Sequence, residues 1–253
     1  IVERQGRDVA AVDINMGCPV TKVVNRGEGS ALMRTPELAA EVVAAVVGAC
    51  DVPVTVKMRT GWSATDINAV EFARAMEAAG AAALAVHGRT RSQFYRGRAD
   101  WDLIAAVKRA VHVPVIGSGD VFSAADAKAM FDETGVDAVM VARGAQGNPW
   151  IFREARALLD HGEVLAPPTP IERVDMAREH ARGLVEFAGE YAIVRMRKHM
   201  TWYLTDMPGA THVRRRTNRV RTYAELDDLL AEYGRYLGRQ TSREHTERPA
   251  EEP

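Results

Sequence analysis

Five short apolar runs, each followed by a longer alanine-rich stretch, occupy residues 9–159 and constrain the fold of this chain. Near-continuous runs of Val and Ile are typical of parallel strands buried on both faces, and the stretches between them are typical of helices. Thr35 and Ser123 are expected to cap helix N-termini, and Gly80 to end a helix. The expected strands are residues 9–16, 52–58, 81–87, 113–118 and 137–142, and the expected helices include 67–79, 101–110 and 124–133.

Two architectures can be built from repeated strand–helix units. A (β/α)8 barrel needs eight units in about 250 residues, whereas an open doubly wound sheet can use five. Polar side chains at every strand end favour the barrel, because a barrel collects all its strand ends at one mouth. We therefore expect an α/β protein, a TIM barrel of which five units are present, with three units missing before Ile1. The strand-end groups are Asn15 and Cys18, Lys57 and Arg59, His87 and Arg89, Ser118 and Asp120, and Arg143.

Composition excludes several classes of protein. The 33 Lys and Arg nearly balance the 34 Asp and Glu, so any nucleic-acid surface must come from local clustering. Two cysteines do not make a disulfide framework and are typical of a reducing compartment, here predicted to be the cytoplasm. No apolar stretch approaches the ~20 residues of a membrane span, and no His, Cys or Asp spacing is typical of a metal site. Nothing in the sequence specifies an oligomeric state.

The strand-end groups suggest two kinds of chemistry. Cys18 lies between a glycine and a proline just past a strand, where a protonated thiol could act as a general acid; an inert buried cysteine is the alternative, and the one favoured for Cys50. Lys57 ends an apolar strand and needs an anionic or electron-rich partner, with His87 on the next run. The small residues around Gly119 and Gly144 could bind a phosphate through backbone N–H groups, or could be simple glycine turns.

Together these segments resemble the tRNA-dihydrouridine synthases, in particular the bacterial B-type branch. The resemblance covers residues 9–205. The matching motifs are Asp13-Ile-Asn-Met-Gly-Cys-Pro19, Gly29-Ser-Ala-Leu32, Val56-Lys-Met-Arg-Thr-Gly61, His87-Gly-Arg-Thr-Arg91, Ser118-Gly-Asp120, Ala145-Gln-Gly-Asn-Pro-Trp-Ile-Phe152 and Arg197-Lys-His-Met-Thr-Trp-Tyr203.

The resemblance implies an FMN-dependent oxidoreductase that reduces uridine in tRNA to 5,6-dihydrouridine, with NADPH as the reductant. It implies that Cys18 donates a proton to uracil C5 and that flavin supplies the hydride to C6. Lys57 and His87 would contact the flavin ring, and Ser118, Gly119, Asp120, Ala142 and Arg143 the FMN phosphate. Substrate contacts would come from Asn15, Arg59, Arg89, Arg197, Lys198 and His199.

Three departures from the family pattern affect these expectations. Ser118 stands where the family usually has Asn, and Ala142 where it usually has Gly; both keep small or polar side chains. The family's opening Pro-Met-Ala-Gly strand and a flavin-holding glutamine would precede Ile1, so we expect this polypeptide to bind FMN poorly or not at all.

A proline-rich stretch at residues 167–170 is expected to separate two domains. Helices are predicted at 171–188, 192–205 and 223–237. Residues 171–221 contain 11 Lys and Arg against 6 Asp and Glu, which predicts a basic surface for tRNA; a solvated charged face is the alternative. The predicted domains are 1–166 (partial FMN-binding barrel), 167–238 (helical, tRNA-binding) and a disordered tail at 239–253. The basic residues are Arg195, Arg197, Lys198, Arg214, Arg215, Arg216 and Arg219, near Trp202 and Tyr203.

Two other functions are compatible with the same residues. The first is a flavin-dependent barrel reductase acting on a free pyrimidine, which the basic helical region disfavours. The second is a tRNA-binding remnant without catalytic activity, since the first three units are expected to be missing. Binding to tRNA distinguishes the first from a tRNA-modifying enzyme.

Overall fold

The computed structural model describes residues 9–247, with side chains up to residue 240. It divides into two compact units, the first Ile1–Gly144 with Leu158–His161, and the second Ala145–Ala157 with Gly162–Pro253. The predicted boundary at residue 166 therefore lies too late for residues 145–157. The reason is local packing: a Cβ on Gly147 would lie 2.5 Å from the carbonyl carbon of Trp202, so this loop is closely packed against a helix of the second unit.

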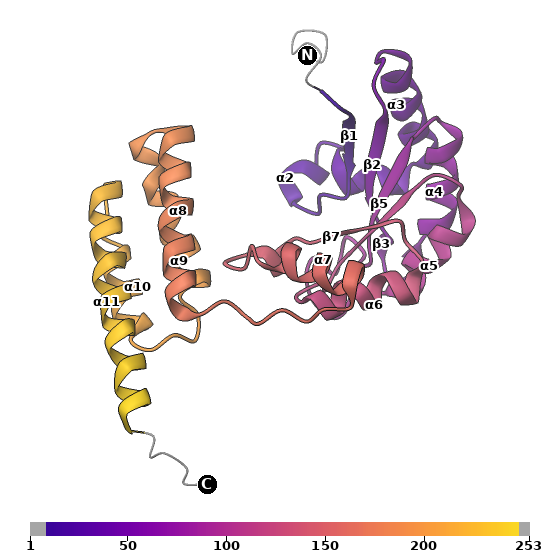
Figure 1. Cartoon of the computed structure of the whole chain (residues 1–253). Coiled ribbons are helices and arrows are strands. Elements are labelled where there is room, and N and C mark those ends of the chain that lie inside the picture. Colours follow the sequence, from indigo (N-terminus) through magenta and orange to yellow (C-terminus); the bar gives the residue numbers. More distant parts are fainter. Residues whose placement is uncertain (1–8, 248–253) are drawn as a thin grey trace, which may run out of the picture. The chain divides into compact units, whose positions relative to one another are not determined.

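The first unit contains a five-stranded parallel sheet in the order β1-β2-β5-β6-β7 (Figure 1). Each predicted run overlaps one of its strands; four strands are shorter than predicted, and β2 continues one residue past its predicted end, to Arg59. The order follows the chain without reversal, so the sheet has no topological switch point, unlike the doubly wound alternative. The strands are β1 (Val12–Met16), β2 (Val54–Arg59), β5 (Ala83–His87), β6 (Val115–Ser118) and β7 (Ala138–Met140).

The two faces of this sheet differ in polarity. Burial alternates along β1, where Val12, Ile14 and Met16 are more buried than Asp13 and Asn15 between them. The expectation of strands apolar on both faces is therefore wrong for this strand. Helices lie along one side of the sheet (Figure 1). They are α3 (Pro36–Gly48), α4 (Ala69–Ala78), α5 (Trp101–Ala110) and α6 (Ala124–Thr134).

The apolar face packs directly against these helices. A Cβ on Gly117 of β6 would lie 2.6 Å from the Met130 sulfur of α6, so glycine permits close helix–sheet packing. Val56, Met58, Leu84 and Val86 are fully buried. The polar face is left for the functional groups.

Of the two side-chain caps predicted at helix N-termini, one is present. The Ser123 side chain accepts a hydrogen bond from the Asp126 N–H at the start of α6, as predicted. The Thr35 side chain makes no such bond, so its predicted cap is wrong. At α5 the cap is Asp100, whose carboxylate accepts from Leu103 N.

A short antiparallel hairpin, β3 (Gly61–Ser63) and β4 (Asp66–Ile67), was not predicted. It delays α4 until Ala69, two residues after the expected start. Its strands are too short to show an alternating pattern. Gly61 has φ 156°, and a Cβ there would collide with the Asp66 carbonyl oxygen, so only glycine closes this hairpin.

The second unit is helical. Its elements differ from the prediction. In place of one helix at 192–205, the chain forms a 3₁₀ segment, Glu190–Arg195, followed by the helix α9 (Met196–Tyr203). Helix α10 (Ala210–Thr217) was not predicted, because its Arg-rich sequence has no periodic apolar residues. The last helix reaches Glu247, so the disorder predicted from residue 239 is wrong up to that point; residues 248–253 lie outside the described residues. The helices are α7 (Ile151–His161, shared with the first unit), α8 (Pro170–Ala188), α9 (Met196–Tyr203), α10 (Ala210–Thr217) and α11 (Tyr223–Glu247).

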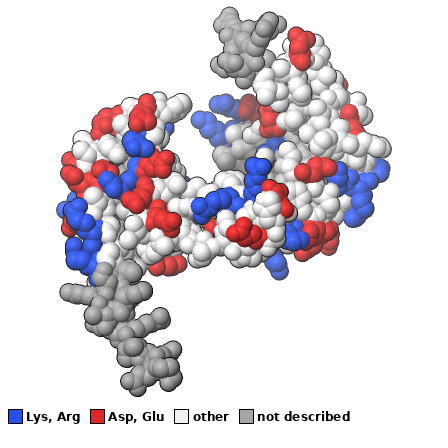
Figure 2. Space-filling model, viewed as in Figure 1, with Lys and Arg blue, Asp and Glu red and all other residues white. Residues whose placement is uncertain are grey.

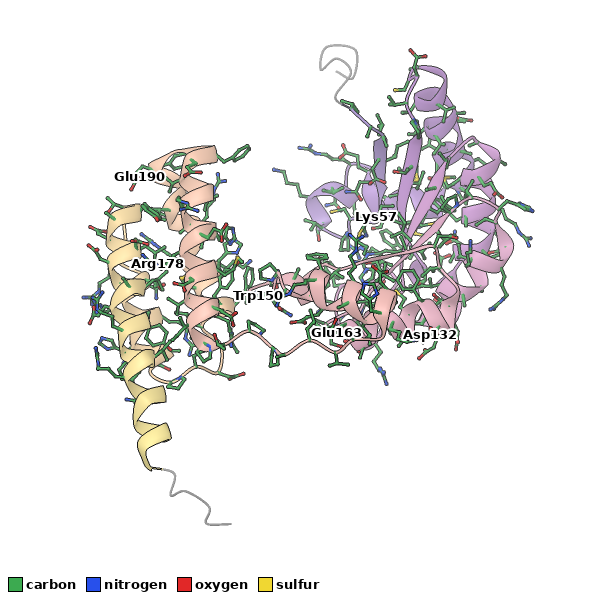
Figure 3. All side chains as sticks on the ribbon, in the orientation of Figure 1. Lys57, Asp132, Trp150, Glu163, Arg178 and Glu190 are labelled. Carbon is green, nitrogen blue, oxygen red and sulfur yellow. The ribbon has the colours of Figure 1, made fainter. Side chains whose placement is uncertain are left out.

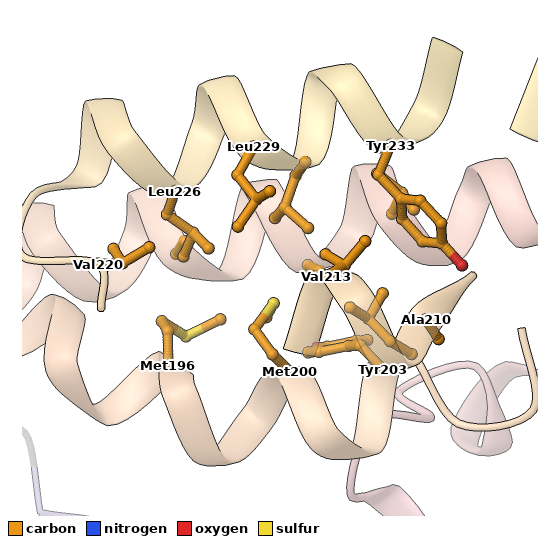
Figure 4. Packing of buried hydrophobic residues seen from close by; sticks show 14 of the residues in the cluster. Met196, Met200, Tyr203, Ala210, Val213, Val220, Leu226, Leu229 and Tyr233 are labelled. Carbon is orange, nitrogen blue, oxygen red and sulfur yellow. The ribbon is translucent and has the colours of Figure 1, made fainter. Parts of the chain in front are cut away.

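A methionine-, leucine- and tyrosine-rich core joins α8, α9, α10 and α11 (Figure 4). Met196 and Met200 of α9 and Leu230 of α11 are fully buried. Arg178 of α8, labelled in Figure 3, bridges to α11 by donating to both carboxylate oxygens of Asp227, at 2.7 and 3.0 Å. The second unit thus has its own apolar core and its own internal ion pair.

Candidate active site

The functional side chains gather at the carboxyl ends of neighbouring strands. Asn15 lies opposite Lys57 in the β1–β2 register. Arg59, His87 and Ser118 form a continuous row across β2, β5 and β6. Residues two apart on a strand share a face, so the Asn15–Lys57 pair and this row lie on the polar side of the sheet. Tertiary structure thus brings together residues that are 103 positions apart in the chain, from Asn15 to Ser118.

The turn that bears Cys18 is held by hydrogen bonds from three directions. Asn15 Oδ1 accepts from the N–H groups of Gly17 and Cys18, both at 3.0 Å. Arg59 Nε donates to the Gly17 carbonyl at 2.8 Å. Ser30 donates to the Cys18 carbonyl through its N–H and its hydroxyl, at 3.1 and 2.8 Å. The half-buried thiol therefore sits on a rigid turn.

Asn15 keeps one end of its amide available. Its oxygen is engaged by the turn, while its Nδ2 group has no hydrogen-bond partner among the residues that the structure describes. The side chain is exposed on the polar face of β1. It can therefore orient the cysteine turn and donate to a ligand at the same time.

Lys57 and His87 lie in a cationic, partly desolvated environment (Lys57 is labelled in Figure 3). Burial lowers the pKa of Lys57, the nearby Arg59 charge lowers it further, and Asp13 opposes both. Burial and the charges of Arg59, Lys57 and Arg89 lower the pKa of His87 to about 3. At neutral pH His87 is therefore an uncharged imidazole, with one N–H donor and one acceptor nitrogen.

A network centred on Asp120 joins the last three strand ends. One nitrogen of Arg89 donates to both Asp120 oxygens, at 2.7 and 2.8 Å, and Arg143 donates at 3.2 Å. The Ala99 N–H completes the set at 2.7 Å. Burial alone would raise the pKa of Asp120, but these hydrogen bonds and the two arginine charges hold it below its ordinary value.

Arg59 and Arg89 are buried to an extent that their sequence positions did not suggest, at 3% and 2% exposure. Arg59 also donates to the Thr90 and Phe94 carbonyls, at 2.8 and 3.0 Å. Arg89 Nε donates to the Arg96 carbonyl at 3.1 Å. Both guanidinium groups therefore tie the loops of this site together from within.

The loops after β6 and β7 form a narrow cradle. Gly119 has φ 121°, and a Cβ there would lie 2.7 Å from Ala99 Cβ and 2.9 Å from His87 Cδ2. The backbone N–H groups of Gly119 and Asp120 have no hydrogen-bond acceptor in the described part of the chain. Free N–H groups in a glycine turn are typical of anion binding.

Two exposed aromatic residues at this site were missed. Tyr95 is 57% exposed, and Phe122 is 49% exposed. The Arg143 guanidinium lies over both rings, 5.0 and 5.3 Å from their centres, and Arg59 lies 6.0 Å from the Tyr95 ring centre. For Tyr95 the local signal was its aromatic neighbour Phe94 within an Arg-rich loop.

The three predicted substrate contacts of the helical region lie on α9. Arg197 donates to the Val220 carbonyl at 2.7 Å, which commits one nitrogen to the fold. Lys198 is exposed and lies 5.2 Å from the Trp202 ring centre, and His199 stacks edge-on against Trp202 and His180. Ala142, predicted to bind phosphate, is exposed in the first unit after β7.

The predicted basic surface of the second unit is partly neutralised. Arg216, Arg215 and Arg219 are all exposed, and Arg216 pairs with Glu232 at 2.8 Å. In the view of Figure 2, acidic and basic side chains are interspersed over the helices of this unit. The charge excess is therefore less concentrated than the sequence suggested.

Two classes of feature are not found among residues 9–247. No helix there is long and apolar enough to cross a bilayer. No group of three or more His, Cys, Asp or Glu side chains in the described residues could hold a metal ion.

Comparisons with known proteins agree on one family. The family model described as dihydrouridine synthase matches residues 1–236. The chain is 46% identical to tRNA-dihydrouridine synthase B of Proteus vulgaris over 88% of its length and 69% of that protein's. It is 49% identical to the enzyme of the same name from Pseudomonas aeruginosa, over 83% of this chain and 63% of that one. The chain thus spans about two thirds of the length of these relatives.

Solved structures are more distant. An Amycolatopsis orientalis BexX/CysO complex matches with a TM-score of 0.42 and 19% identity, over 66% of this chain and 62% of the other. A mandelate oxidase matches with a TM-score of 0.34 and 15% identity, over 87% and 74%. At these low scores neither likeness determines the fold.

Proposed function

The chain belongs to the dihydrouridine synthase family, and we propose that the protein reduces specific uridines of tRNA to 5,6-dihydrouridine, with FMN as cofactor and NADPH as reductant. The observation that carries this proposal is the rigid Cys18 turn beside the Asn15–Lys57 pair. A thiol, an amide donor and a cation are thereby collected on one polar face. A tRNA-modifying enzyme of this kind works in the cytoplasm, which we propose as its location.

We propose that the five-stranded sheet is part of the wall of a (β/α)8 barrel. Its sequential strand order and its helices on one side support this. In such a barrel the polar face of the sheet lines the interior, and the carboxyl ends of the strands form the mouth. The Asn15–Lys57 pair and the Arg59–His87–Ser118 row are then where the active sites of such barrels lie.

The residues present fit an FMN group. The free N–H groups of Gly119 and Asp120 suit its phosphate, together with Ser118, Ala142 and the Arg143 guanidinium. Lys57 and neutral His87 would hold the ring system, one as a cation and the other as a hydrogen-bonding group. When bound, FMN supplies the hydride.

The side chains of this chain divide the remaining work. Cys18 Sγ holds the proton that is delivered to uracil C5, and its fixed turn determines where that proton is offered. Asn15 Nδ2 donates to a uracil carbonyl while its Oδ1 holds the turn. Arg59 and Arg89 act indirectly, by positioning the turn and the β5–α5 loop.

The helical unit would bind the body of the tRNA. We propose that exposed Lys198, with Arg215 and Arg219, contacts phosphates, and that His199 beside Trp202 packs against the RNA. Arg197 contributes by fastening α9 to the Val220 carbonyl. A target uridine inside folded tRNA must be turned out of its stack to reach Cys18.

The experiment compares Cys18→Ala with Cys50→Ala, the second half-buried cysteine, on an unmodified tRNA transcript. Loss of a general acid slows a reaction by about 10²- to 10⁴-fold. We expect Cys18→Ala to form dihydrouridine at least about 100-fold more slowly than wild type while binding tRNA and FMN as wild type does, and Cys50→Ala to behave as wild type. Dihydrouridine is measured by mass spectrometry of digested tRNA.

Two results would contradict the proposal. Unchanged turnover in Cys18→Ala would remove the thiol from the mechanism. Wild-type protein that neither binds nor reduces tRNA in the presence of FMN and NADPH, but reduces a free pyrimidine, would replace tRNA by a small-molecule substrate.

A further inference from the structure

The β3–β4 hairpin is fastened to the loop that follows β5. Arg91 N donates to the Gly61 carbonyl at 2.9 Å. Ser92 donates to the Trp62 carbonyl twice, through its N–H at 3.0 Å and its hydroxyl at 2.8 Å. These bonds extend the hairpin with a third segment and fix the position of Trp62.

Two guanidinium groups from different loops converge on this tryptophan. Arg34 lies 5.0 Å and Arg91 4.7 Å from the centre of the Trp62 ring. Arg91 also lies 5.5 Å from the ring centre of Phe94. An aromatic ring attracts cations through its quadrupole, so Trp62 stabilises each of these guanidinium groups beside it.

Among residues 9–240, no side chain neutralises either charge. Arg34 and Arg91 have no carboxylate partner and no side-chain hydrogen bond among the described residues, and the Arg91 Nε atom is buried without a partner. The surrounding sequence, residues 87–98, contains four arginines and no Asp or Glu. Arg89 in this segment is paired with Asp120, in contrast to Arg91. Paired cations without a carboxylate suit a phosphate group.

This arginine pair is connected to the cysteine turn by two routes. Arg34 ends the 3₁₀ helix η2 (Gly29–Arg34), and Ser30 near its start donates to the Cys18 carbonyl. On the other side, the Phe94 carbonyl accepts from Arg59, whose Nε donates to the Gly17 carbonyl. An anion bound by Arg34 and Arg91 would therefore lie at a fixed position relative to the thiol.

We propose that Arg34 and Arg91, held over Trp62, form a clamp for an RNA phosphodiester near the nucleotide that enters the active site. The inference rests on the proposed function and adds to it a specific contact made by the catalytic unit rather than by the helical unit. The clamp positions the RNA backbone, and the cysteine turn, which hydrogen bonds connect to the clamp, contacts the target uracil. NADPH also carries phosphate oxygens, so it is the alternative ligand for this clamp. The experiment below distinguishes binding of RNA from binding of NADPH.

The test measures binding of a fluorescein-labelled unmodified tRNA transcript by anisotropy, as a function of salt. We expect Arg34→Ala with Arg91→Ala to weaken binding by about 10-fold or more near 0.1 M salt. The slope of log K against log salt should become shallower by about 1 to 2, because each lost phosphate contact removes somewhat less than one released counterion. Trp62→Ala should reproduce part of the loss, and Trp62→Phe should retain most of the affinity.

The matched control is Arg109→Ala. Arg109 is exposed in the last turn of α5, at the amino-terminal end of the sheet, because α5 runs antiparallel to the strands that it connects. Its substitution removes one positive charge from the same unit and should leave affinity and slope unchanged. Circular dichroism and thermal unfolding establish that each variant is folded.

Three outcomes decide the matter. Folded double-variant protein with unchanged affinity and salt slope would overturn the clamp, even if wild type reduces tRNA as proposed. Unchanged tRNA affinity with a raised KM for NADPH in flavin reduction would assign the clamp to a nucleotide phosphate and overturn its RNA role. Wild type that neither binds nor reduces tRNA would overturn the proposed function and the clamp together.

Discussion

Asp120→Asn removes one negative charge from the network that joins the ends of β5, β6 and β7 while preserving its shape. The carboxylate accepts from Arg89, Arg143 and the Ala99 N–H in the native protein. Asn tolerates the φ of 58° at this position, so backbone strain does not confuse the result. The substitution leaves the guanidinium of Arg89, at 2% exposure, without its counter-ion.

The magnitude follows from burial. Removing one partner of a fully buried ion pair costs about 3–5 kcal/mol, because the other charge stays buried and uncompensated. Asp120 is 23% exposed, so water screens part of this interaction, and Asn can still accept one hydrogen bond. We therefore expect Asp120→Asn to lower the free energy of unfolding of the first unit by about 2–3 kcal/mol at pH 7.

The pH dependence of this difference has a definite sign. The pKa of Asp120 is lower in the folded protein than in the unfolded chain, whose Asp pKa is about 3.9. Its stabilising effect is therefore fully present above about pH 4 and is lost as pH falls through the lower folded value. The difference between wild type and Asp120→Asn should stay constant from pH 7 to 5.

The assay is urea unfolding at pH 7, 6 and 5, with hydrogen exchange of residues 88–100 to localise the effect to the first unit. Asp132→Asn on α6 is the control, since Asp132 is 59% exposed and pairs with Lys128. Such a surface pair contributes about 0.3–0.5 kcal/mol. Equal stability of Asp120→Asn and wild type at pH 7, or a difference that shrinks between pH 7 and 5, would refute the reasoning.

Three further outcomes are expected. Gly147→Ala should destabilise the second unit by about 2–4 kcal/mol in thermal unfolding, against about 1 kcal/mol for Gly162→Ala. Both glycines have φ near 70°, but of the two only Gly147 packs against Trp202. Equal losses would mean that packing is not the cause. Nitrogen NMR should show a neutral His87 ring from pH 8 to 5, and protonation near pH 6 would contradict its burial. Thr169→Ala should cost about 1 kcal/mol by removing the cap of α8, and a loss below about 0.3 in denaturant unfolding would show that Glu172 is sufficient.

Local sequence was a good guide wherever the determinant was itself local. The apolar runs located all five strands, and the Ser123 cap and the residues of α5 were found because their signals lie within a few positions. The hairpin bearing Trp62 was missed because its short strands depend on Gly61 and on the segment after β5 rather than on a periodic pattern.

The candidate site shows the same division. The polar strand ends identified Asn15, Lys57 and His87 as candidate site residues, and the structure places them near the carboxyl ends of adjacent strands. Burial could not be deduced from these positions, so Arg59 resembled a substrate contact although its guanidinium holds three backbone carbonyls. Tyr95 was overlooked because its position beside Arg143 depends on β7.

The sequence by itself determined which segments become strands and which side chains are chemically unusual for their surroundings, because hydrophobicity and capping act over short distances. Only the tertiary structure decided which face of the sheet is polar, which arginines are buried inside the protein and which remain free for a ligand. Those outcomes depend on strand register and on contacts between loops more than 20 residues apart, such as Arg89 with Asp120, which lie 31 positions apart. The free energy of an ion pair such as Arg89–Asp120 depends on the burial provided by neighbouring segments, and no local sequence pattern specifies that burial.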